Sequence, residues 1–130
     1  MKLFSCTHCG NTVYFENAVC ERCGHQLGYL PDRSALVSLV EDGGLWSSPA
    51  IADDAFVFCA NAAYGACNWL IPTSSPHAWC KACRLNRTVP DLAVPANLAA
   101  WQRLEVAKHR LIYALLRLGL PVAAKWEDPI

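Results

Sequence analysis

The chain has 130 residues, which suffices for one compact domain or two very small ones and falls short of most enzyme scaffolds. With 54% hydrophobic and 17% charged residues, it has too much apolar side chain and too little charge to remain disordered. Its 11 basic and 11 acidic residues balance, so net charge gives no general reason to expect nucleic acid or an anionic membrane as a partner.

Eight cysteines are the most informative feature of the composition. The N-terminal residues run directly into Cys6 and leave no room for the apolar segment of a secretory signal. No stretch approaches 18 uninterrupted apolar residues, so no transmembrane segment is predicted. We therefore expect a cytoplasmic protein whose reduced cysteines bind metal, because that compartment disfavours disulfides.

Two Cys-x-x-Cys-Gly motifs, separated by ten residues, lie near the N-terminus. The two-residue gap lets one tight turn aim two thiolates at the same ion, and the following glycine can turn backbone N–H groups toward the sulfurs. Residues 12–15 have the β-branched and aromatic content of a strand. The pattern predicts a zinc ribbon over residues 1–28. Its predicted ligands are Cys6, Cys9, Cys20 and Cys23.

The same motifs occur in two other kinds of site. A redox Cys-x-x-Cys pair is disfavoured, because the two motifs are spaced to hold one metal together and no βαβ pattern surrounds them. Iron in a rubredoxin-like site uses the same four thiolates, so the motifs indicate metal binding more firmly than they indicate zinc.

The other four cysteines predict a second structural zinc ion. Its predicted ligands are Cys59, Cys67, Cys80 and Cys83. Only the last two form a Cys-x-x-Cys motif, and the first two enclose a loop of small residues that includes Gly65. His77 stands three residues before Cys80, which leaves open that it replaces Cys59 or Cys67 as the fourth ligand.

The remaining histidines are expected outside the coordination spheres. His8 lies inside the first motif and should point away from a metal that both flanking cysteines bind. His25 and His109 are expected on the surface.

Metal binding makes the charge distribution uneven. Each four-thiolate zinc site carries a formal charge of −2, which takes residues 1–55 to −6 and residues 56–130 to +2. An acidic ribbon argues against the ribbon itself binding phosphates.

The middle of the chain, residues 29–95, predicts a small antiparallel sheet around the second metal. Strands are expected at 35–40, 45–46, 55–58 and 68–71, with a hairpin turn at 42–44, a linker at 28–33 and a polar loop at 50–54. Pro72 should end the last strand. The predicted fold class is thus a small α+β zinc-binding protein.

One long helix is predicted over residues 97–118, within a last unit of residues 96–130 that includes a C-terminal tail with Trp126. Asn97 is the expected N-cap and Gly119 the stop signal. The expected apolar stripe is Trp101, Leu104, Leu111, Leu115 and Leu118, with Ile112 beside it. This stripe either packs on the sheet, docks a following domain or pairs in a homodimer. Arginines at 103, 110 and 117 form a basic ridge on the opposite side, expected to face solvent.

Several of these segments together resemble a known family. They are residues 6–10, 20–25, 59–61, 67–70, 80–86 and 115–121. The chain resembles the N-terminal zinc-ribbon region of a bacterial family of zinc-binding metallopeptidases, and the resemblance covers nearly all 130 residues. It implies a following domain in which a His-Glu-x-x-His helix binds a catalytic zinc.

The chain departs from that family at the catalytic motif. Its four histidines include no His-Glu pair and no His-x-x-x-His, so no catalytic residue is predicted in this chain. We expect a non-catalytic double-zinc module that positions a substrate or protein partner for the peptidase. A nucleic-acid- or ribosome-associated ribbon is the first alternative, disfavoured by the acidic first half, and a thiol-based redox or zinc switch is the second.

Overall fold

The computed structural model describes residues 3–123, apart from the side chains of residues 52 and 53. Two strands form the ribbon, five form a second sheet, and one long helix follows. The elements are β1 (Phe4–Ser5), β2 (Thr12–Val13), β3 (Gln26–Leu30), β4 (Ala35–Asp42), β5 (Leu45–Ser48), β6 (Ile51–Phe58), the 3-10 helix η1 (Ala60–Tyr64), β7 (Leu70–Pro72), the 3-10 helix η2 (Cys83–Leu85) and α1 (Pro95–Arg117). The chain is therefore a small α+β protein, as predicted.

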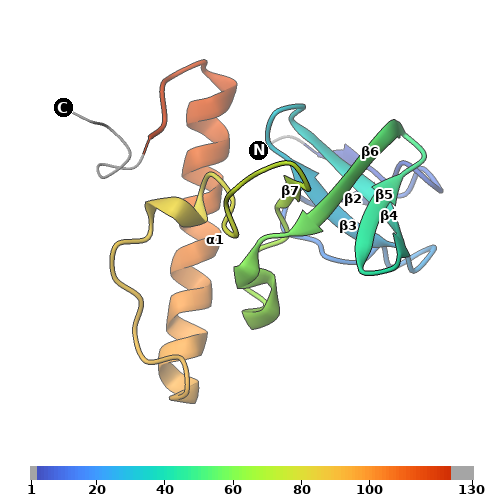
Figure 1. The fold of residues 1–130 in the computed structure, drawn as a ribbon. Coiled ribbons are helices and arrows are strands. Elements are labelled where there is room, and N and C mark those ends of the chain that lie inside the picture. The colour runs from blue at the N-terminus through green and yellow to red at the C-terminus, as the bar shows by residue number, and fades with distance from the viewer. Residues whose placement is uncertain (1–2, 124–130) are drawn as a thin grey trace.

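The five strands form an antiparallel meander in the order β3-β4-β5-β6-β7. The sheet curls so that its two outer strands approach each other, and Tyr29 in β3 forms a parallel bridge with Trp69, the residue before β7. The β4–β5 hairpin turns at Gly43 and Gly44, whose φ angles of 60° and 84° suit a two-residue turn that matches strand twist. Figure 1 shows the curled sheet beside the ribbon, with α1 along its side.

The predicted strands at 35–40 and 45–46 and the turn between them are confirmed. Two segments predicted to be irregular are strands instead. The predicted linker at 28–33 contains most of β3, and the predicted loop at 50–54 contains the start of β6. Gly28 allows β3 to pack tightly, since a Cβ there would lie 2.6 Å from Cγ and Cδ1 of Leu70. Strand β3 also crosses the predicted domain boundary at residue 28, and the three-unit division stays a prediction.

Two other boundaries differ from the expected ones. Strand β2 covers only residues 12–13 of the predicted 12–15, and β7 starts two residues later than predicted. Pro72 ends β7 as expected.

The helix α1 begins at Pro95, with Val94 as the N-cap residue, and ends before Gly119, whose φ is 72°. The predicted Asn97 cap is wrong: Pro95 occupies the first turn, where its missing N–H costs nothing, and Asn97 instead donates a hydrogen bond to the Asp91 carbonyl. The predicted tail with Trp126 extends beyond the described residues.

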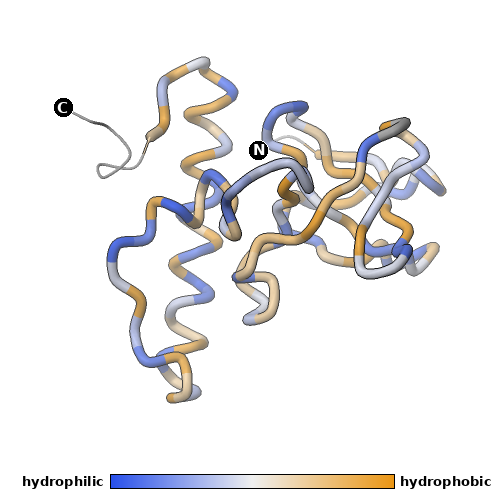
Figure 2. The backbone as a smooth tube through the Cα atoms, viewed as in Figure 1, coloured by the Kyte–Doolittle hydropathy of each residue, from blue (hydrophilic) through white to orange (hydrophobic). Residues whose placement is uncertain are grey.

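The predicted apolar face of α1 is also wrong in part. The buried residues are Trp101, Glu105, His109, Ile112 and Tyr113. Leu104, Leu111 and Leu118 lie exposed. Figure 2 shows hydrophobic and hydrophilic residues alternating along the helix. Within residues 3–123, no helix is both long and apolar enough to cross a membrane.

One aromatic cluster joins the ribbon, the sheet and the helix. The ring centroid of Phe15 in the ribbon lies 4.9 Å from that of Tyr29 in β3, 6.1 Å from that of Trp69 and 5.0 Å from that of Tyr113 in α1. Phe15, Tyr29 and Trp69 are almost fully buried. The three parts therefore all contribute side chains to one hydrophobic core.

Candidate metal centres

The first cysteine quartet is built on the β1–β2 hairpin. Pairing of Phe4 with Val13 places the first Cys-x-x-Cys motif at the end of β1. The backbone N–H of Gly10 donates to the carbonyl of Cys6, and that of Gly24 donates to Cys20, closing two equivalent turns. Both glycines have φ near 80°, a conformation that L side chains rarely adopt. The turns therefore bring four sulfurs together from two separate loops.

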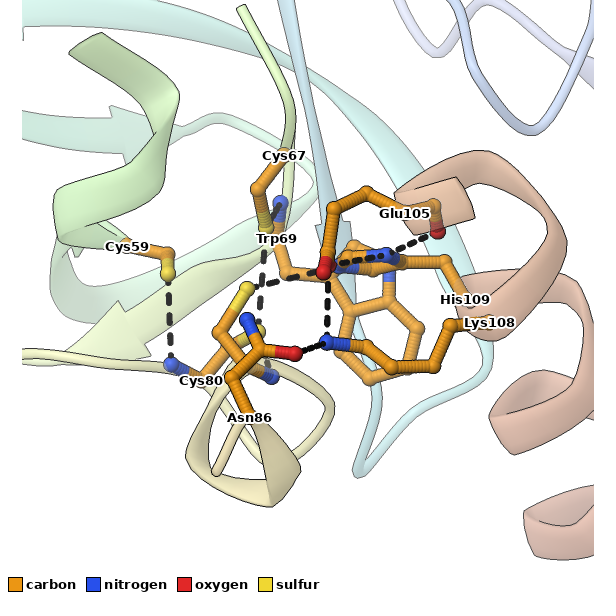
Figure 3. Close-up of polar contacts among 9 residues, drawn as sticks. Cys59, Cys67, Trp69, Cys80, Asn86, Glu105, Lys108 and His109 are labelled. Carbon is orange, nitrogen blue, oxygen red and sulfur yellow. Dashed lines mark hydrogen bonds and ion pairs between the residues drawn. The ribbon is translucent and has the colours of Figure 1, made fainter. Parts of the chain in front are cut away.

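The second quartet lies at the junction of the sheet and α1. Cys59 follows β6, Cys67 precedes β7, and the last motif leads into η2. Backbone N–H groups converge on the sulfurs: Cys80 donates to Cys59, Cys83 donates to Cys80, and Trp69 donates to Cys67, each at 3.4 Å. Figure 3 shows these contacts. Such N–H donors stabilise thiolates, which are the form that binds metal.

The geometry of both quartets fits zinc. In each, all four sulfur atoms lie within 4.8 Å of one another. The sulfurs of Cys6 and Cys23 are 3.7 Å apart, those of Cys9 and Cys20 are 3.6 Å apart, and those of Cys67 and Cys80 are 3.7 Å apart. A tetrahedral ion with Zn–S bonds of about 2.3 Å separates its sulfurs by about 3.8 Å. The chain thus has two four-cysteine sites for structural zinc ions.

The electrostatics of the quartets also favour a cation. In the second quartet, hydrogen bonds with Cys67 and then Cys80 lower the pKa of Cys59, whereas the contact with Cys59 raises the pKa of Cys67. In the ribbon, a backbone hydrogen bond from Cys23 is the largest cause that lowers the pKa of Cys20, to about 6. Thiols this close ionise at each other's expense unless a metal ion neutralises them.

The histidines differ from expectation in one important case. His109 was predicted on the surface, but it is only 4% exposed, and its Nε2 lies 3.6 Å from the sulfur of Cys83. Its ring also packs edge-on against Trp69, with centroids 5.2 Å apart. Apart from its i, i+4 spacing from Glu105, a lone histidine among arginines and lysines on a helix carries no sequence signal of burial.

Around His109 lies a buried polar cluster (Figure 3). The Nδ1 of His109 is 2.6 Å from the backbone carbonyl of Glu105 and 3.6 Å from the carboxylate of the same residue. That carboxylate is 2.7 Å from Nζ of Lys108, which also donates to Asn86. Since a carbonyl only accepts, Nδ1 must carry a proton, and this fixes the orientation of the ring with Nε2 toward Cys83.

The other histidines lie outside the two quartets. His77 is exposed in the loop after β7 and belongs to no metal-binding group among the described residues. His25 is half-buried, and its Nδ1 lies 3.3 Å from the sulfur of Cys23, a contact that the sequence did not suggest. The ring of His8 stacks on that of His25 with centroids 4.1 Å apart.

A cavity of about 330 Å³ opens beside the second quartet. Its walls include Phe15, Trp46, Phe58, Cys67 and His109. Most of the cavity's lining residues are apolar, which suits an apolar ligand.

Comparison with known proteins agrees with this description. A zinc-ribbon domain model matches residues 3–94, which contain both quartets and end where α1 begins. Uncharacterized proteins of Mycobacterium bovis and of two strains of Mycobacterium tuberculosis are each 38% identical to this chain over 130 residues. The match covers 99% of this chain and 35% of each relative, so the chain spans about a third of their length. No solved structure matches. With most of its length matched by the family model, the chain belongs to the zinc-ribbon domain family.

Proposed function

We propose that this chain is a non-catalytic double-zinc module that positions a protein substrate or partner, and that it serves as the N-terminal region of a zinc metallopeptidase. The observation that carries the proposal is the closed character of both quartets, each of which supplies four sulfurs to one ion. A zinc ion held by four thiolates has no position for the water that hydrolysis requires.

Two further points support a role within a larger protein. The chain aligns along nearly its whole length with about a third of each mycobacterial relative, so the module is one part of longer chains in those proteins. The resemblance to the ribbon region of metallopeptidases supports the proposal of a catalytic domain after the module. The ribbon, the sheet and α1 share one core, so the module presents its surfaces in a fixed arrangement.

The chain itself provides the first test. We expect two zinc ions per molecule and no hydrolysis of casein or of short peptides. Casein hydrolysis by the pure protein that disappears with Cys83→Ser would contradict the proposal. The nucleic-acid alternative predicts salt-dependent binding of single-stranded oligonucleotides, and we expect none at physiological salt.

The full-length Mycobacterium tuberculosis relative provides the second test. We expect three zinc ions in that protein and hydrolysis of protein substrates. Deleting the segment that matches this chain should raise KM for a protein substrate and leave kcat for a short peptide nearly unchanged, because the module positions the substrate and takes no part in the reaction. Two zinc ions and no hydrolysis would overturn the peptidase assignment.

A further inference from the structure

One long face of α1 is left uncovered by the rest of the described chain. Leu104 and Leu111 of α1 and its C-cap residue Leu118 are 69%, 56% and 73% exposed, although the other side of the helix is buried. Ala107 and Ala114 between them are exposed as well. We call this face the α1 seam. It consists of Ala100, Leu104, Ala107, Leu111, Ala114 and Leu118.

The spacing of the seam is that of a coiled coil. Its residues follow one another at alternating intervals of four and three, which places leucine at every a position and alanine at every d position of a heptad. At about 1.5 Å per residue the seam is about 27 Å long. The small alanines leave holes between the leucines, into which side chains of a second helix can insert. The seam therefore fits a helix better than a flat surface.

Charge beside the seam restricts the partner. Arg103, Arg110 and Arg117 each precede a seam leucine and so occupy the g positions. Arg110 pairs with Glu16 of the ribbon, whereas Arg117 packs over Tyr113 and Arg103 has no acidic partner within the described residues. The only acidic side chain of α1, Glu105, is 3% exposed. The exposed side of α1 is thus apolar and cationic.

This charge pattern argues against a second copy of the chain as the occupant. In an antiparallel pair of α1 helices the g-position arginines would face one another, and in a parallel pair they would face the e position, which includes Lys108. The antiparallel arrangement brings like charges together, and the parallel one offers the arginines no acidic partner, because Lys108 is already paired with Glu105. Acidic residues in the partner would instead pair with Arg103 and Arg117.

We propose that the α1 seam is the docking site for an amphipathic helix of a protein partner, with leucine-like residues at its a and d positions and acidic residues beside them. The inference deepens the proposed function. It rests on that function at one point, namely that the molecule bound at the seam is a protein. Binding at the seam needs no peptidase activity, so the two proposals can fail separately.

The probe is a synthetic 21-residue helix of three heptads with Leu at a and d and Glu at e and g. A matched peptide carries Lys at e and g. Fluorescence anisotropy with the zinc-loaded protein should show binding of the Glu peptide, and binding of the Lys peptide should be at least about tenfold weaker. Adding salt should reduce this preference, because exposed ion pairs are screened.

Variants of the protein locate the binding site. Leu111→Gln should weaken binding of the Glu peptide at least about tenfold, because it removes a central apolar contact. Leu45→Gln, at an exposed leucine in β5, should have no effect. Combining Arg103→Glu with Arg117→Glu should reverse the preference in favour of the Lys peptide. Circular dichroism and zinc content should match the wild type in every variant.

Three results would overturn the proposal. The first is equal binding, or no binding, of the two peptides. The second is a wild-type dimer by light scattering that Leu111→Gln dissociates, which would make the seam a self-association surface. The third is binding to vesicles of anionic phospholipid that Leu111→Gln abolishes, which would make it a membrane-contacting face.

Discussion

The Nε2 atom of His109 lies 3.6 Å from the sulfur of Cys83, so a buried side chain of α1 touches a residue of the second zinc site. Groups that contact metal ligands orient them and commonly change metal affinity by about 10- to 100-fold. His109 is therefore a positioning residue that couples the helix to the metal.

We predict that His109→Phe releases the second zinc to a chelator at least about tenfold faster, because the substitution removes the contact with Cys83. His77→Phe, at an exposed histidine, should leave the release rate unchanged. Cobalt substitution provides the check on the ligand set: charge-transfer bands typical of four thiolates should persist in His109→Phe. A spectrum showing a nitrogen ligand in the wild type would contradict this role.

We predict that Cys20→Ser and Cys83→Ser each remove at least one of the two zinc ions. Each structural zinc contributes on the order of 10 kcal/mol to folding, which exceeds the stability margin of a small domain. Because Phe15 of the ribbon packs in the common core, both losses should change the near-UV circular dichroism of the aromatic cluster. If Cys20→Ser lost zinc from the ribbon and left the near-UV circular dichroism of the aromatic cluster unchanged, the ribbon would fold independently.

We predict that Phe15→Ala destabilises the zinc-loaded protein by about 3–5 kcal/mol, because it leaves a cavity among the rings of Tyr29, Trp69 and Tyr113. The neighbouring residue Tyr14 is exposed, so Tyr14→Ala should cost less than about 1 kcal/mol. Urea unfolding monitored by tryptophan fluorescence measures both values. Equal effects of the two substitutions would mean that the shared core does not hold the ribbon in place.

The metal sites were predictable from the sequence because their geometry is local. A two-residue gap between cysteines brings two thiolates to one ion whatever the rest of the chain does. The rule covers the whole first quartet and the Cys80 and Cys83 half of the second. Cys59 and Cys67 belong to no Cys-x-x-Cys motif, yet their sulfurs lie within 4.8 Å of the other two. The count of eight cysteines was enough to group them.

The buried face of α1 was not predictable in the same way. Hydrophobic periodicity favoured the column that contains Leu104 and Leu111, but those residues face outward. Glu105 and His109 are buried because Lys108 and Cys83 provide polar partners. Lys108 is a near neighbour of Glu105 on the helix, whereas Cys83 is brought to His109 only by the fold. Burial of a polar side chain follows from such partners and not from the helix pattern.

The sequence of strand β3 does not indicate a strand, for a related reason. Its glycine and the following Pro31 and Asp32 have the composition of a loop, whereas the segment is held by pairing with β4 and by tight packing on β7. A glycine in a strand interior often marks a close approach of another chain segment, and here that segment carries Leu70.

We predict that Gly28→Ala destabilises the protein by about 1–3 kcal/mol, because its Cβ would lie 2.6 Å from Cγ and Cδ1 of Leu70 and 2.9 Å from Cδ1 of Leu39. The φ angle of Gly28 is not positive, so the cost comes from overpacking and not from backbone strain. Combining Gly28→Ala with Leu70→Ala should therefore cost less than the sum of the two single changes, since the smaller side chain makes room for the added methyl group. Urea unfolding of the four zinc-loaded proteins gives the coupling free energy between the two positions. Strictly additive effects would show that the two residues do not compete for space, and would remove the packing explanation for the glycine in β3.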